Sequence, residues 1–528
     1  MSGHFSISYT PPSPAKVLYL VALGGNVSGV NSAIGLSGVL GLSDAALSSV
    51  TINELTTVAA EWALAQFTDS TGTQIGAPST DAIGLTNAAN QAQANLADVT
   101  TGGLPTFLSA LTCPPASGPT PPNCDGQERM NTFANILWSC VQSSSSASAN
   151  CTGLLGYTAG STTLSAAHFM AANPVSSTAT TADLYALQTF SSPFTPKLNA
   201  TPDGTEIALN FAPGGLTSQA LAIDSHGGVW VNNSSATPSV LELSSSGATL
   251  GNFTADSNFV TPSGIAIDDS GNVWVADQSG AVIELASNGA YSNSFGASTN
   301  ATGIAADGAG DIWVTSPGAD GLTELSPSGN TYSSSGIDPN GPSFDDPIGI
   351  AIDKSSNVWI ANHGASDLIE VQGGNTSEAF GASSALSQPY AIAIDAIGNI
   401  WVADQDYAGI IEVTTIDTVN TYQPEGGDFG APAGIALDTA GNVWLTNHST
   451  NCVTQWNTNS STAGFFAPAG DPFVNPAGIA IDASGDVWVV NSNVDDSSVT
   501  EIIGAAGPVL TPIAACLDQA SPGNLCLP

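Results

Sequence analysis

A fifteen-residue phrase that recurs seven times in the second half of the chain constrains the fold more than any other feature. One copy, residues 263–277, reads SGIAIDDSGNVWVAD. It combines an apolar strand, a tight turn rich in Asp and Gly, and a second strand built around a tryptophan. The tryptophans lie 39 to 46 residues apart, at Trp230, Trp274, Trp313, Trp359, Trp401, Trp444 and Trp488.

Units of roughly 40 to 45 residues that each contain several short strands are typical of a β-propeller. In the copy quoted above, a third strand at 282–285 and a looser fourth strand near 291–296 complete a four-stranded blade. The intervals therefore predict a mainly β protein with a seven-bladed propeller over residues 200–510. Six blades and a stray repeat are the alternative.

The two ends of the repeat region indicate how the ring closes. The last copy reaches VTEII at 499–503, and no fourth strand follows in AGPVLTP. Before the first copy, TEIALNF at 205–211 reads as a strand without a blade of its own. Pairing these two strands would complete the last blade and remove the open edges of the ring.

Residues that occupy the same place in every copy are interpreted as structural, because every blade has to fold. The aspartates that open the turns are Asp224, Asp268, Asp307, Asp353, Asp395, Asp438 and Asp482. The third-strand glutamates, replaced by Gln455 in the sixth copy, are Glu242, Glu284, Glu324, Glu370, Glu412 and Glu501.

A short polar residue ends the second strand of each copy, three positions after the tryptophan. Such residues suit an Asx-type turn. Because they would ring one face of the propeller, they would also offer oxygen ligands to a divalent cation such as Ca²⁺, and we keep this as a candidate site. The candidate rim residues are Asn233, Asp277, Asn362, Asn447 and Asn491, with Ser316 and Asp404 completing the ring.

The phrase GIAIDDSGNVWVAD and its copies resemble the NHL-repeat propellers and, through the N-V-W signature, the streptogramin-lyase (virginiamycin B lyase) propellers. The resemblance covers residues 205–505. A β module, an Ala-rich helical domain with two Cys pairs and a propeller, in this order, resemble secreted NHL-repeat proteins of environmental bacteria. The resemblance implies an exported or surface protein and no particular chemistry.

His363 and His448 break the symmetry, one position after the strand end of the fourth and sixth copies, with Asp404 and Asp406 between them. Two imidazoles on one rim beside carboxylates suggest a general-base or metal site, and the streptogramin lyases are similar in using rim histidines, a glutamate and a divalent metal. The chain departs from them, because its strands end VWVAD or VWLTN rather than in Glu, and it has no His-x-x-His or Glu-x-x-His cluster. Ordinary loop histidines are the competing interpretation, and no catalytic residue is assigned.

The front half divides into two parts. Alternating residues near Phe5 and Val17 predict two strands, and GHFSIS resembles the Gly-x-Phe-x-Ile strand of small immunoglobulin-like modules related to carboxypeptidase regulatory domains. We expect residues 1–28 to be part of such a module, whose first strands and any signal peptide are absent from this chain. Residues 29–195 predict an Ala-rich helical domain, with helices at 51–67, 81–99, 125–143 and 178–190. Asp125 is the expected N-cap of the third helix, and His168 a structural histidine rather than a ligand.

Three cysteine pairs each enclose a short polar loop, which predicts disulfides in an oxidising compartment. The favoured pairs are Cys113–Cys124, Cys140–Cys151 and, in a C-terminal tail at 511–528, Cys516–Cys526, although the first four cysteines allow three connectivities. The seventh, Cys452, is expected to be a buried or half-buried thiol. The sequence contains no CxxC spacing of the kind that binds zinc, so it does not indicate a zinc site.

The net charge of −40 comes from a shortage of bases, since the chain has 44 acidic residues but only four Lys and Arg. Four cations cannot supply the phosphate contacts of a nucleic-acid or anionic-membrane partner. No apolar run approaches a membrane span. Few tryptic sites and carboxylates that lose their charge near pH 4 suit a protein outside the cell; a composition bias of the whole lineage is the alternative.

These observations favour a non-enzymatic, secreted or cell-surface scaffold that binds an extracellular protein or glycan. That interpretation predicts exposed aromatic or Asn-rich rim patches and no buried titratable cluster. The alternative is a metal-dependent lyase or lactonase, which would bring His363, Asp404 and His448 together around a pocket at one mouth. A structural or fibre-forming subunit is a third possibility, which the sequence does not rank.

Overall fold

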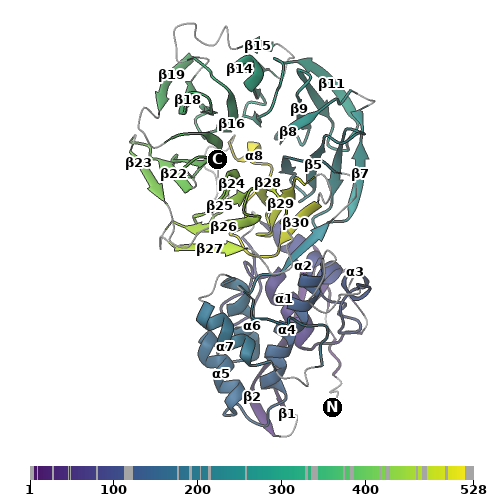
Figure 1. Ribbon diagram of the computed structural model, residues 1–528. Coiled ribbons are helices and arrows are strands. Elements are labelled where there is room, and N and C mark those ends of the chain that lie inside the picture. Colours follow the sequence, from purple (N-terminus) through teal and green to yellow (C-terminus); the bar gives the residue numbers. More distant parts are fainter. Residues whose placement is uncertain are drawn as a thin grey trace.

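The structure is a computed structural model in which seven four-stranded antiparallel sheets surround a central axis and a helical unit packs against one side of the ring (Figure 1). It describes residues 5–8, 10–26, 29–45, 47, 49–78, 81–111, 123–174, 178–188, 193–202, 204–211, 216–255, 258–326, 331–333, 343–372, 375–380, 386–407, 409–416, 418–422, 429–458, 462–466, 473–493 and 498–517.

Each sheet forms one blade, and in blades 1 to 6 the strands follow one another from the axis outwards in chain order. Blades 1 to 3 comprise β4 Leu221–Ile223, β5 Val229–Asn233, β6 Ser239–Leu243 and β7 Thr249–Phe253; β8 Pro262–Ile267, β9 Val273–Asp277, β10 Ala281–Leu285 and β11 Tyr291–Gly296; and β12 Ile304–Ala306, β13 Ile312–Ser316, β14 Gly321–Leu325 and β15 Thr331–Ser333. Blades 4 and 5 comprise β16 Pro347–Ile352, β17 Val358–Asn362, β18 Asp367–Gln372 and β19 Asn375–Phe380; and β20 Pro389–Ile394, β21 Ile400–Asp404, β22 Gly409–Val413 and β23 Val419–Tyr422. Blades 6 and 7 comprise β24 Pro432–Leu437, β25 Asn442–Asn447, β26 Cys452–Asn457 and β27 Thr462–Phe466; and β28 Pro476–Ile481, β29 Val487–Asn491, β30 Ser498–Ile502 and β3 Ala208–Phe211.

The outer strand of blade 7 comes from the opposite end of the repeat region. Strand β3 pairs antiparallel with β30, with Ala208 opposite Ile502 and Phe211 opposite Val499. This pairing supplies the fourth strand that the last repeat lacks and leaves no blade incomplete among the described residues. The seven-bladed ring closed by the 205–211 segment is therefore confirmed, and the six-bladed alternative is wrong.

A tryptophan–aspartate contact holds the turn of every blade. The indole N–H of each repeat tryptophan donates to Oδ2 of the turn aspartate at 2.9–3.4 Å. Oδ1 of the same aspartate accepts the main-chain N–H four residues further on at 2.8–3.0 Å. The third-strand Glu, or Gln455 in blade 6, lies directly opposite the tryptophan on the neighbouring strand. The repeated aspartates thus serve folding, because their oxygens are occupied by the turn and the tryptophan.

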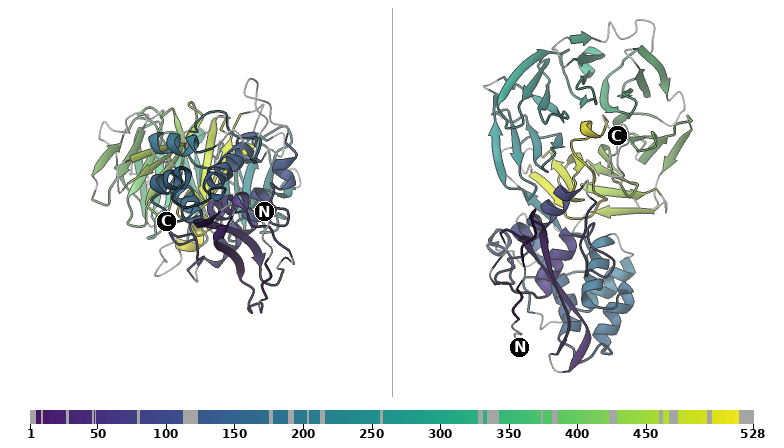
Figure 2. Two further views of the ribbon diagram at one scale, coloured as in Figure 1. Left: turned by 90° about the horizontal axis from the view of Figure 1, so that it is seen from below. Right: turned by 180° about the vertical axis from the view of Figure 1, so that it is seen from behind.

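The front half forms a β-ribbon that lies along one side of a group of helices (Figure 2). The ribbon consists of β1 Val17–Asn26 and β2 Val30–Leu42, paired antiparallel. The helices are α1 Glu54–Ala63, α2 Ala82–Gln91, the π-helical turn η1 Ala92–Leu96, α3 Thr106–Ser109, α4 Cys124–Val141, α5 Ala149–Thr158, α6 Thr163–Ala172 and α7 Thr178–Ala186. We call residues 16–188 the helical unit.

This unit differs from the expectation in several places. Residues 5–8, where a strand was expected, have no regular secondary structure. The partner of β1 is instead β2, which hydrogen-bonds through Gly35 and Ser37 to side chains of the helices. Helix α4 begins before Asp125, so that the carboxylate of Asp125 lies in its first turn and accepts from Arg129 at 2.6 Å rather than capping the helix. The boundaries predicted for the module and the helical domain stay predictions.

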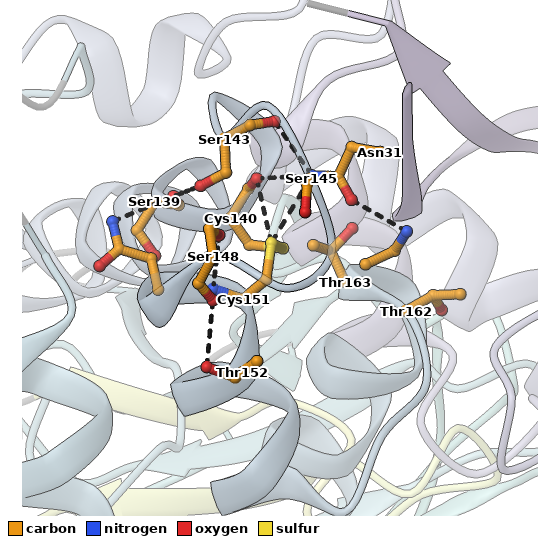
Figure 3. The surroundings of a disulfide bond; sticks show 12 residues. Asn31, Ser139, Cys140, Ser143, Ser145, Ser148, Cys151, Thr152, Thr162 and Thr163 are labelled. Carbon is orange, nitrogen blue, oxygen red and sulfur yellow. Dashed lines mark hydrogen bonds between the residues drawn. A yellow bond between two sulfur atoms is a disulfide. The ribbon is translucent and has the colours of Figure 1, made fainter. Parts of the chain in front are cut away.

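A disulfide joins Cys140 at the end of α4 to Cys151 in α5 (Figure 3), as predicted. The side-chain amide of Asn31 on β2 donates to the carbonyl of Cys140 at 3.0 Å, which fixes the ribbon to this bridge. Cys124 is also disulfide-bonded, but Cys113, its predicted partner, lies outside the described residues. Cys526, the predicted partner of Cys516, also lies outside the described residues. Cys452 is a buried thiol, as expected.

The helical unit and the propeller share one hydrophobic core, which continues from α1 and α4 into blades 1 and 7. Polar contacts cross the same boundary: the indole N–H of Trp62 donates to Thr205 O at 2.7 Å, and the amide of Asn95 donates to Ser246 O at 2.8 Å. The helical unit is therefore fixed to the ring. Among the described residues, no helix is long and apolar enough to cross a membrane.

Candidate functional site

The axis of the ring contains a tunnel of about 270 Å³. Its side chains are almost all aliphatic, because the inner strand of each blade carries the Ile-Ala-Ile pattern of the repeat. These inner strands are also the inner edges of the seven sheets. The middle ring of the lining consists of Ala222, Ala266, Ala305, Ala351, Ala393, Ala436 and Ala480.

The chain's own C-terminal segment covers one mouth of this tunnel, on the face that carries the Asp turns, which we call the turn face. The N–H of Gly507 donates to Asp438 Oδ2 at 3.1 Å, the N–H of Val509 to Asp482 O at 3.0 Å, and the hydroxyl of Thr511 to Asp224 O at 2.7 Å. Helix α8 (Ala514–Leu517) follows, near the axis of the ring (Figure 1). The tail thus spans blades 6, 7 and 1 beneath the tunnel.

The candidate rim residues at the strand ends lie buried on the opposite face. Asn233 Oδ1 accepts from Thr217 N at 2.9 Å, Asp277 Oδ2 from Val260 N at 2.8 Å and Asn362 Oδ1 from Asp345 N at 2.7 Å. Asn491 Oδ1 likewise accepts from Val474 N at 3.1 Å, and the amide of Asn447 donates to Thr454 Oγ1 at 2.8 Å. The contacts of Asn233, Asp277, Asn362 and Asn491 hold the loops that lead into the inner strands, and that of Asn447 joins β25 to β26. Among the described residues, no group of three or more His, Cys, Asp and Glu side chains is placed to hold a metal ion.

His363 lies beside Asp346 and Tyr390. Its Nδ1 is 3.1 Å from Asp346 Oδ2, its main-chain N–H donates to Asp346 O at 3.2 Å, and its ring meets the Tyr390 ring edge-on with centroids 6.3 Å apart. Burial and, secondly, the charge of Asp346 raise the pKa of the Tyr390 hydroxyl. The sequence did not indicate Asp346, because it lies outside the repeated phrase.

The other three candidates of the enzymatic interpretation have different surroundings. The Asp404 carboxylate accepts main-chain N–H groups of Ser387 and Tyr407 at 2.8 and 3.0 Å, and Asp406 Oδ2 lies 3.4 Å from the Ser387 hydroxyl. His448 is partly buried, which lowers its pKa. No contact that the described residues make joins His363 to Asp404, Asp406 or His448.

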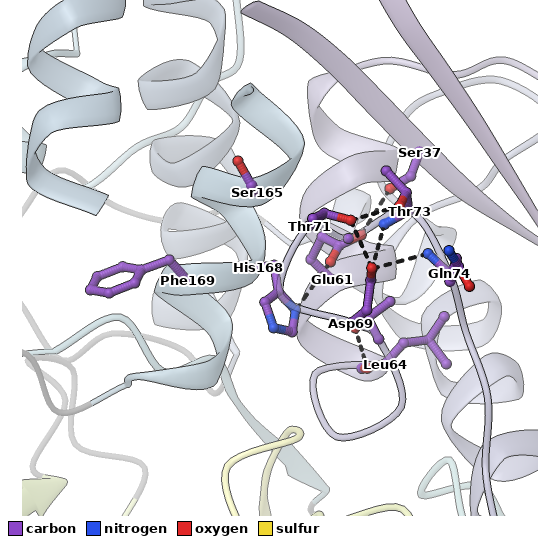
Figure 4. A network of polar contacts seen from close by, with 12 residues as sticks. Ser37, Glu61, Leu64, Asp69, Thr71, Thr73, Gln74, Ser165, His168 and Phe169 are labelled. Atoms are coloured by element: carbon purple, nitrogen blue, oxygen red, sulfur yellow. Dashed lines mark hydrogen bonds and ion pairs between the residues drawn. The ribbon is translucent and has the colours of Figure 1, made fainter. Parts of the chain in front are cut away.

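A buried titratable cluster lies inside the helical unit (Figure 4). Glu61 on α1 accepts hydrogen bonds from Tyr19 and, at 3.2 Å, from Ser37, and its Oε2 lies 3.5 Å from His168 Nδ1 on α6. Burial raises the pKa of Glu61, and the contacts with His168 and Tyr19 oppose this rise. His168 therefore has a structural partner in Glu61, which agrees with its expected role.

A second cluster lies where α2 meets blade 7. Asp482, Asp486 and Glu501 are fully buried there, and Asp81 at the start of α2 is 1 % exposed. Gln91 at the end of α2 donates to Glu501 Oε2. We call these four acids the carboxyl cluster. The binding-scaffold interpretation predicted no buried titratable cluster, and the carboxyl cluster and the Glu61 cluster differ from that expectation. None of the residues in these two clusters lines the tunnel or the grooves described next.

The turn face of blade 5 carries two exposed isoleucines. Ile397, in the turn after β20, is 70 % exposed, and Ile416, in the turn after β22, is 80 % exposed. The N–H of Thr415 donates to Asn399 Oδ1 at 3.2 Å, so that the two turns lie side by side. We call Ile397 and Ile416 the isoleucine ridge. The residues equivalent to Ile397 in the other blades are small or polar: His226, Ser270, Ala309, Ser355, Ala440 and Ser484.

A groove flanks Ile397 on each side. The groove towards blade 4 has a volume of about 300 Å³ and contains Lys354, Trp359 and Glu370. The groove towards blade 6 has a volume of about 200 Å³ and contains Trp401 and Asp438. Comparing the turns copy by copy, as was done for the strand ends, would have revealed Ile397 from the sequence.

The sequence matches no protein-family model and no curated protein. Among solved structures, streptogramin B lyase aligns with a TM-score of 0.50 at 17% sequence identity, over 56% of this chain and 98% of that chain. Virginiamycin B lyase from Staphylococcus aureus aligns with a TM-score of 0.49 at 14% identity, over 56% and 98% of the two chains. The WD40 propeller domain of Doa1 aligns with a TM-score of 0.45 at 13% identity, over 55% and 94%. Similarity at this level shows the fold alone, and the expected lyase-like propeller is confirmed at that level.

Proposed function

We propose that the protein is a non-enzymatic binding scaffold outside the cell or on its surface, and that the isoleucine ridge binds an extracellular protein. The observation that carries this proposal is the ridge itself, since two large apolar side chains are 70 % and 80 % exposed on adjacent turns of one blade. The other blades place small or polar residues at the position of Ile397. A feature that one blade has and the ring does not need for folding is available for recognition.

The shape and chemistry of the site favour a protein over a glycan. Full burial of an isoleucine side chain against a partner contributes about 1.5–3 kcal/mol to the free energy of binding. The grooves on either side of Ile397 offer space for side chains of that partner. Sugars commonly stack on open aromatic faces, but Trp359 and Trp401 in these grooves are only 8 % and 4 % exposed. An aliphatic ridge between grooves suits apolar side chains instead.

The charge of the chain further narrows the class of partner. With a net charge of −40, the protein attracts cationic surfaces and repels acidic ones. Lys354 is the one base in the two grooves, beside Asp353, Glu370, Asp395 and Asp438. We therefore expect a partner that presents apolar side chains within a basic surface, and an association rate that falls with added salt.

The disulfide chemistry supports a location outside the cytoplasm. Cys140 and Cys151 are joined, and Cys124 is disulfide-bonded as well. Such bonds persist in oxidising compartments and are rare in the cytosol of mesophiles.

The test is a binding comparison with labelled protein. The wild type, an Ile397→Ser/Ile416→Ser variant and a Leu250→Ser control are overlaid on the separated secreted and envelope proteins of the producing cells and on a glycan array. Leu250 is 59 % exposed on β7 of blade 1 and controls for the loss of an exposed aliphatic residue. We expect the ridge variant to lose at least tenfold in affinity for a protein that the wild type and the control bind equally, which corresponds to about 1.4 kcal/mol. Equal binding by all three proteins, or binding to glycans alone, would refute the proposal.

A further inference from the structure

We propose that protons shared within the carboxyl cluster hold the helical unit to the propeller, so that this joint is closed in acid and opens as the medium becomes alkaline. The inference is independent of the proposed function. It rests on the position of α2 over blade 7, on burial, and on a break in the repeat.

Helix α2 lies across the Asp turn of blade 7 and meets acidic groups at both ends. At its start, the hydroxyl of Ser484 donates to Gly84 O at 3.3 Å, and a Cβ at Gly84 would lie 1.9 Å from Ala483 O, so that the helix and the turn are in direct contact. At its end, the Gln91 amide donates to Glu501 Oε2 and accepts from Asn95 at 2.9 Å. The cluster is therefore sealed between the helical unit and the propeller.

Asp486 and Glu501 hydrogen-bond to each other through their side chains. A carboxylate has no proton to donate, so one member of such a pair must carry one. Glu501 Oε1 is buried and meets no donor among the described residues, which leaves this oxygen for the shared proton. Asp81 Oδ2 is buried in the same way.

The repeat shows that a buried acid at the position of Asp486 is special to blade 7, because the equivalent Asp311 of blade 3 is partly exposed. The position of Asp486 is asparagine in blades 2, 4, 5 and 6, where the amide donates to Oδ2 of the turn aspartate at 2.7–3.0 Å. In blade 7 that donor is missing, and Asp486 instead accepts from Gly504 N at 2.6 Å and faces two further acids. The position of Glu501 is a glutamine, Gln455, in blade 6. Neutral amides therefore fit these positions in a blade of this protein.

The groups that face the cluster from the packed elements are acidic or neutral. The turn contributes Asp482 and Asp486, β30 contributes Glu501, β29 contributes the indole of Trp488, and α2 contributes Asp81 and Gln91. On β3, Leu209 lies opposite Glu501, and Glu206, just before this strand, is paired with Arg129 at 2.9 Å. Burial first, and then the charge of neighbouring aspartates, raise the pKa of Asp486 and Glu501.

The direction of the pH dependence follows from these raised pKa values. A carboxyl whose pKa is higher in the folded than in the open state stabilises the joint at a pH below the open-state pKa, about 4. This stabilisation is lost as the pH rises through the folded-state values, which are about 7 for Asp81 and higher than usual for Asp482, Asp486 and Glu501. For each proton that is released on opening, the equilibrium constant for opening the joint rises about tenfold for each unit by which the pH increases.

Hydrogen exchange of the intact chain between pH 5 and pH 8 tests the inference, with peptides from α2 as the readout and peptides from β17 and β18 of blade 4 as the internal reference. After correction for intrinsic exchange rates, we expect α2 of the wild type to lose protection by about tenfold per pH unit, while blade 4 changes little. In Asp486→Asn and in Glu501→Gln the loss of protection per pH unit should be smaller than in the wild type, because Asp81 and Asp482 then remain as the groups with raised pKa values.

The control is Asp311→Asn, which changes the equivalent, partly exposed position in blade 3 and should leave the wild-type pH dependence of α2 intact. The second cluster variant keeps the test decisive if the first does not fold, because glutamine is already present at that position in blade 6. Protection of α2 that does not change with pH, or that changes equally in the wild type and in the folded cluster variant, would overturn the inference.

Discussion

At the scale of single residues, the repeat makes functional and structural side chains separable. A side chain present in all seven copies occupies the same contacts in each, as the turn aspartates show with the tryptophan and the main chain. A side chain that differs from those of most copies, such as Ile397 or Asp486, lies at a position where the fold accepts other residues. The seven copies thus show which positions the fold requires to be constant and which positions tolerate other residues.

The turn aspartate of blade 6 offers a direct test of the structural role. Asp438 is 1 % exposed and accepts from the Trp444 indole, from the Asn442 amide and from Gly507 N. Asp438→Ala would leave these donors without their acceptor, and we expect the free energy of unfolding to fall by about 3 kcal/mol or more. Asp269→Ala, at an exposed position of the blade 2 turn, should change it by less than about 0.5 kcal/mol. Urea unfolding measures both, and equal effects would contradict the structural role.

His168 allows a similar comparison in the helical unit. His168→Ala removes the neighbour of Glu61 Oε2, an oxygen without another partner among the described residues. We expect a loss of about 1–3 kcal/mol in stability, since a buried polar group loses its contact. The control His226→Ala changes an exposed histidine and should be neutral. If thermal unfolding shows no difference between the two variants, the structural interpretation of His168 fails.

At the scale of elements, the propeller strands were predictable and the front half only partly so. The same strand pattern occurs in seven copies, so the strands of a copy with a weak pattern can be placed by alignment with the other copies. Helices α1 and α4 carry clear apolar stripes and were predicted, but α5 (ANCTGLLGYT) contains two glycines and no stripe. Strand β2 (VNSAIGLSGVLGL) is buried at several consecutive positions, so its sequence shows no alternation of apolar and polar residues. Ile397 stands out when the turns of the copies are compared, but the carboxyl cluster depends on which turn meets helix α2, and no local pattern contains that information.

The Cys140–Cys151 bridge makes a prediction at this scale. It closes a segment with a sequence separation of 11 residues between α4 and α5. In the chain-entropy account its removal by Cys140→Ser/Cys151→Ser costs about 3 kcal/mol. The disulfide is the covalent link between α5 and Cys140, whose carbonyl accepts from Asn31 on the ribbon. Because the variant lacks this link, we expect α5 to lose protection from hydrogen exchange first. Cys452→Ala should leave α5 unchanged, and equal protection of α5 in all variants would contradict this account.

At the scale of the whole molecule, charge and ring closure determine stability. The net charge of −40 destabilises the compact state by self-repulsion, which salt screens. We expect the unfolding temperature at pH 7 to rise when NaCl increases from 0.01 to 0.5 M, and to respond much less at pH 4, where many carboxylates are protonated. A scanning calorimetry series at the two pH values measures this, and an equal response at both would show that self-repulsion is not the cause.

The central claim is that seven blades form one closed ring, in which β3 from the start of the repeat region completes the last blade and so leaves only individual turns free for recognition. Native-state hydrogen exchange of residues 208–211 tests it most directly. If the ring is closed in this way, these amides exchange together with those of β30 and with the same free energy of opening. Exchange of β3 at the rate of a free strand, while β30 stays protected, would contradict the claim.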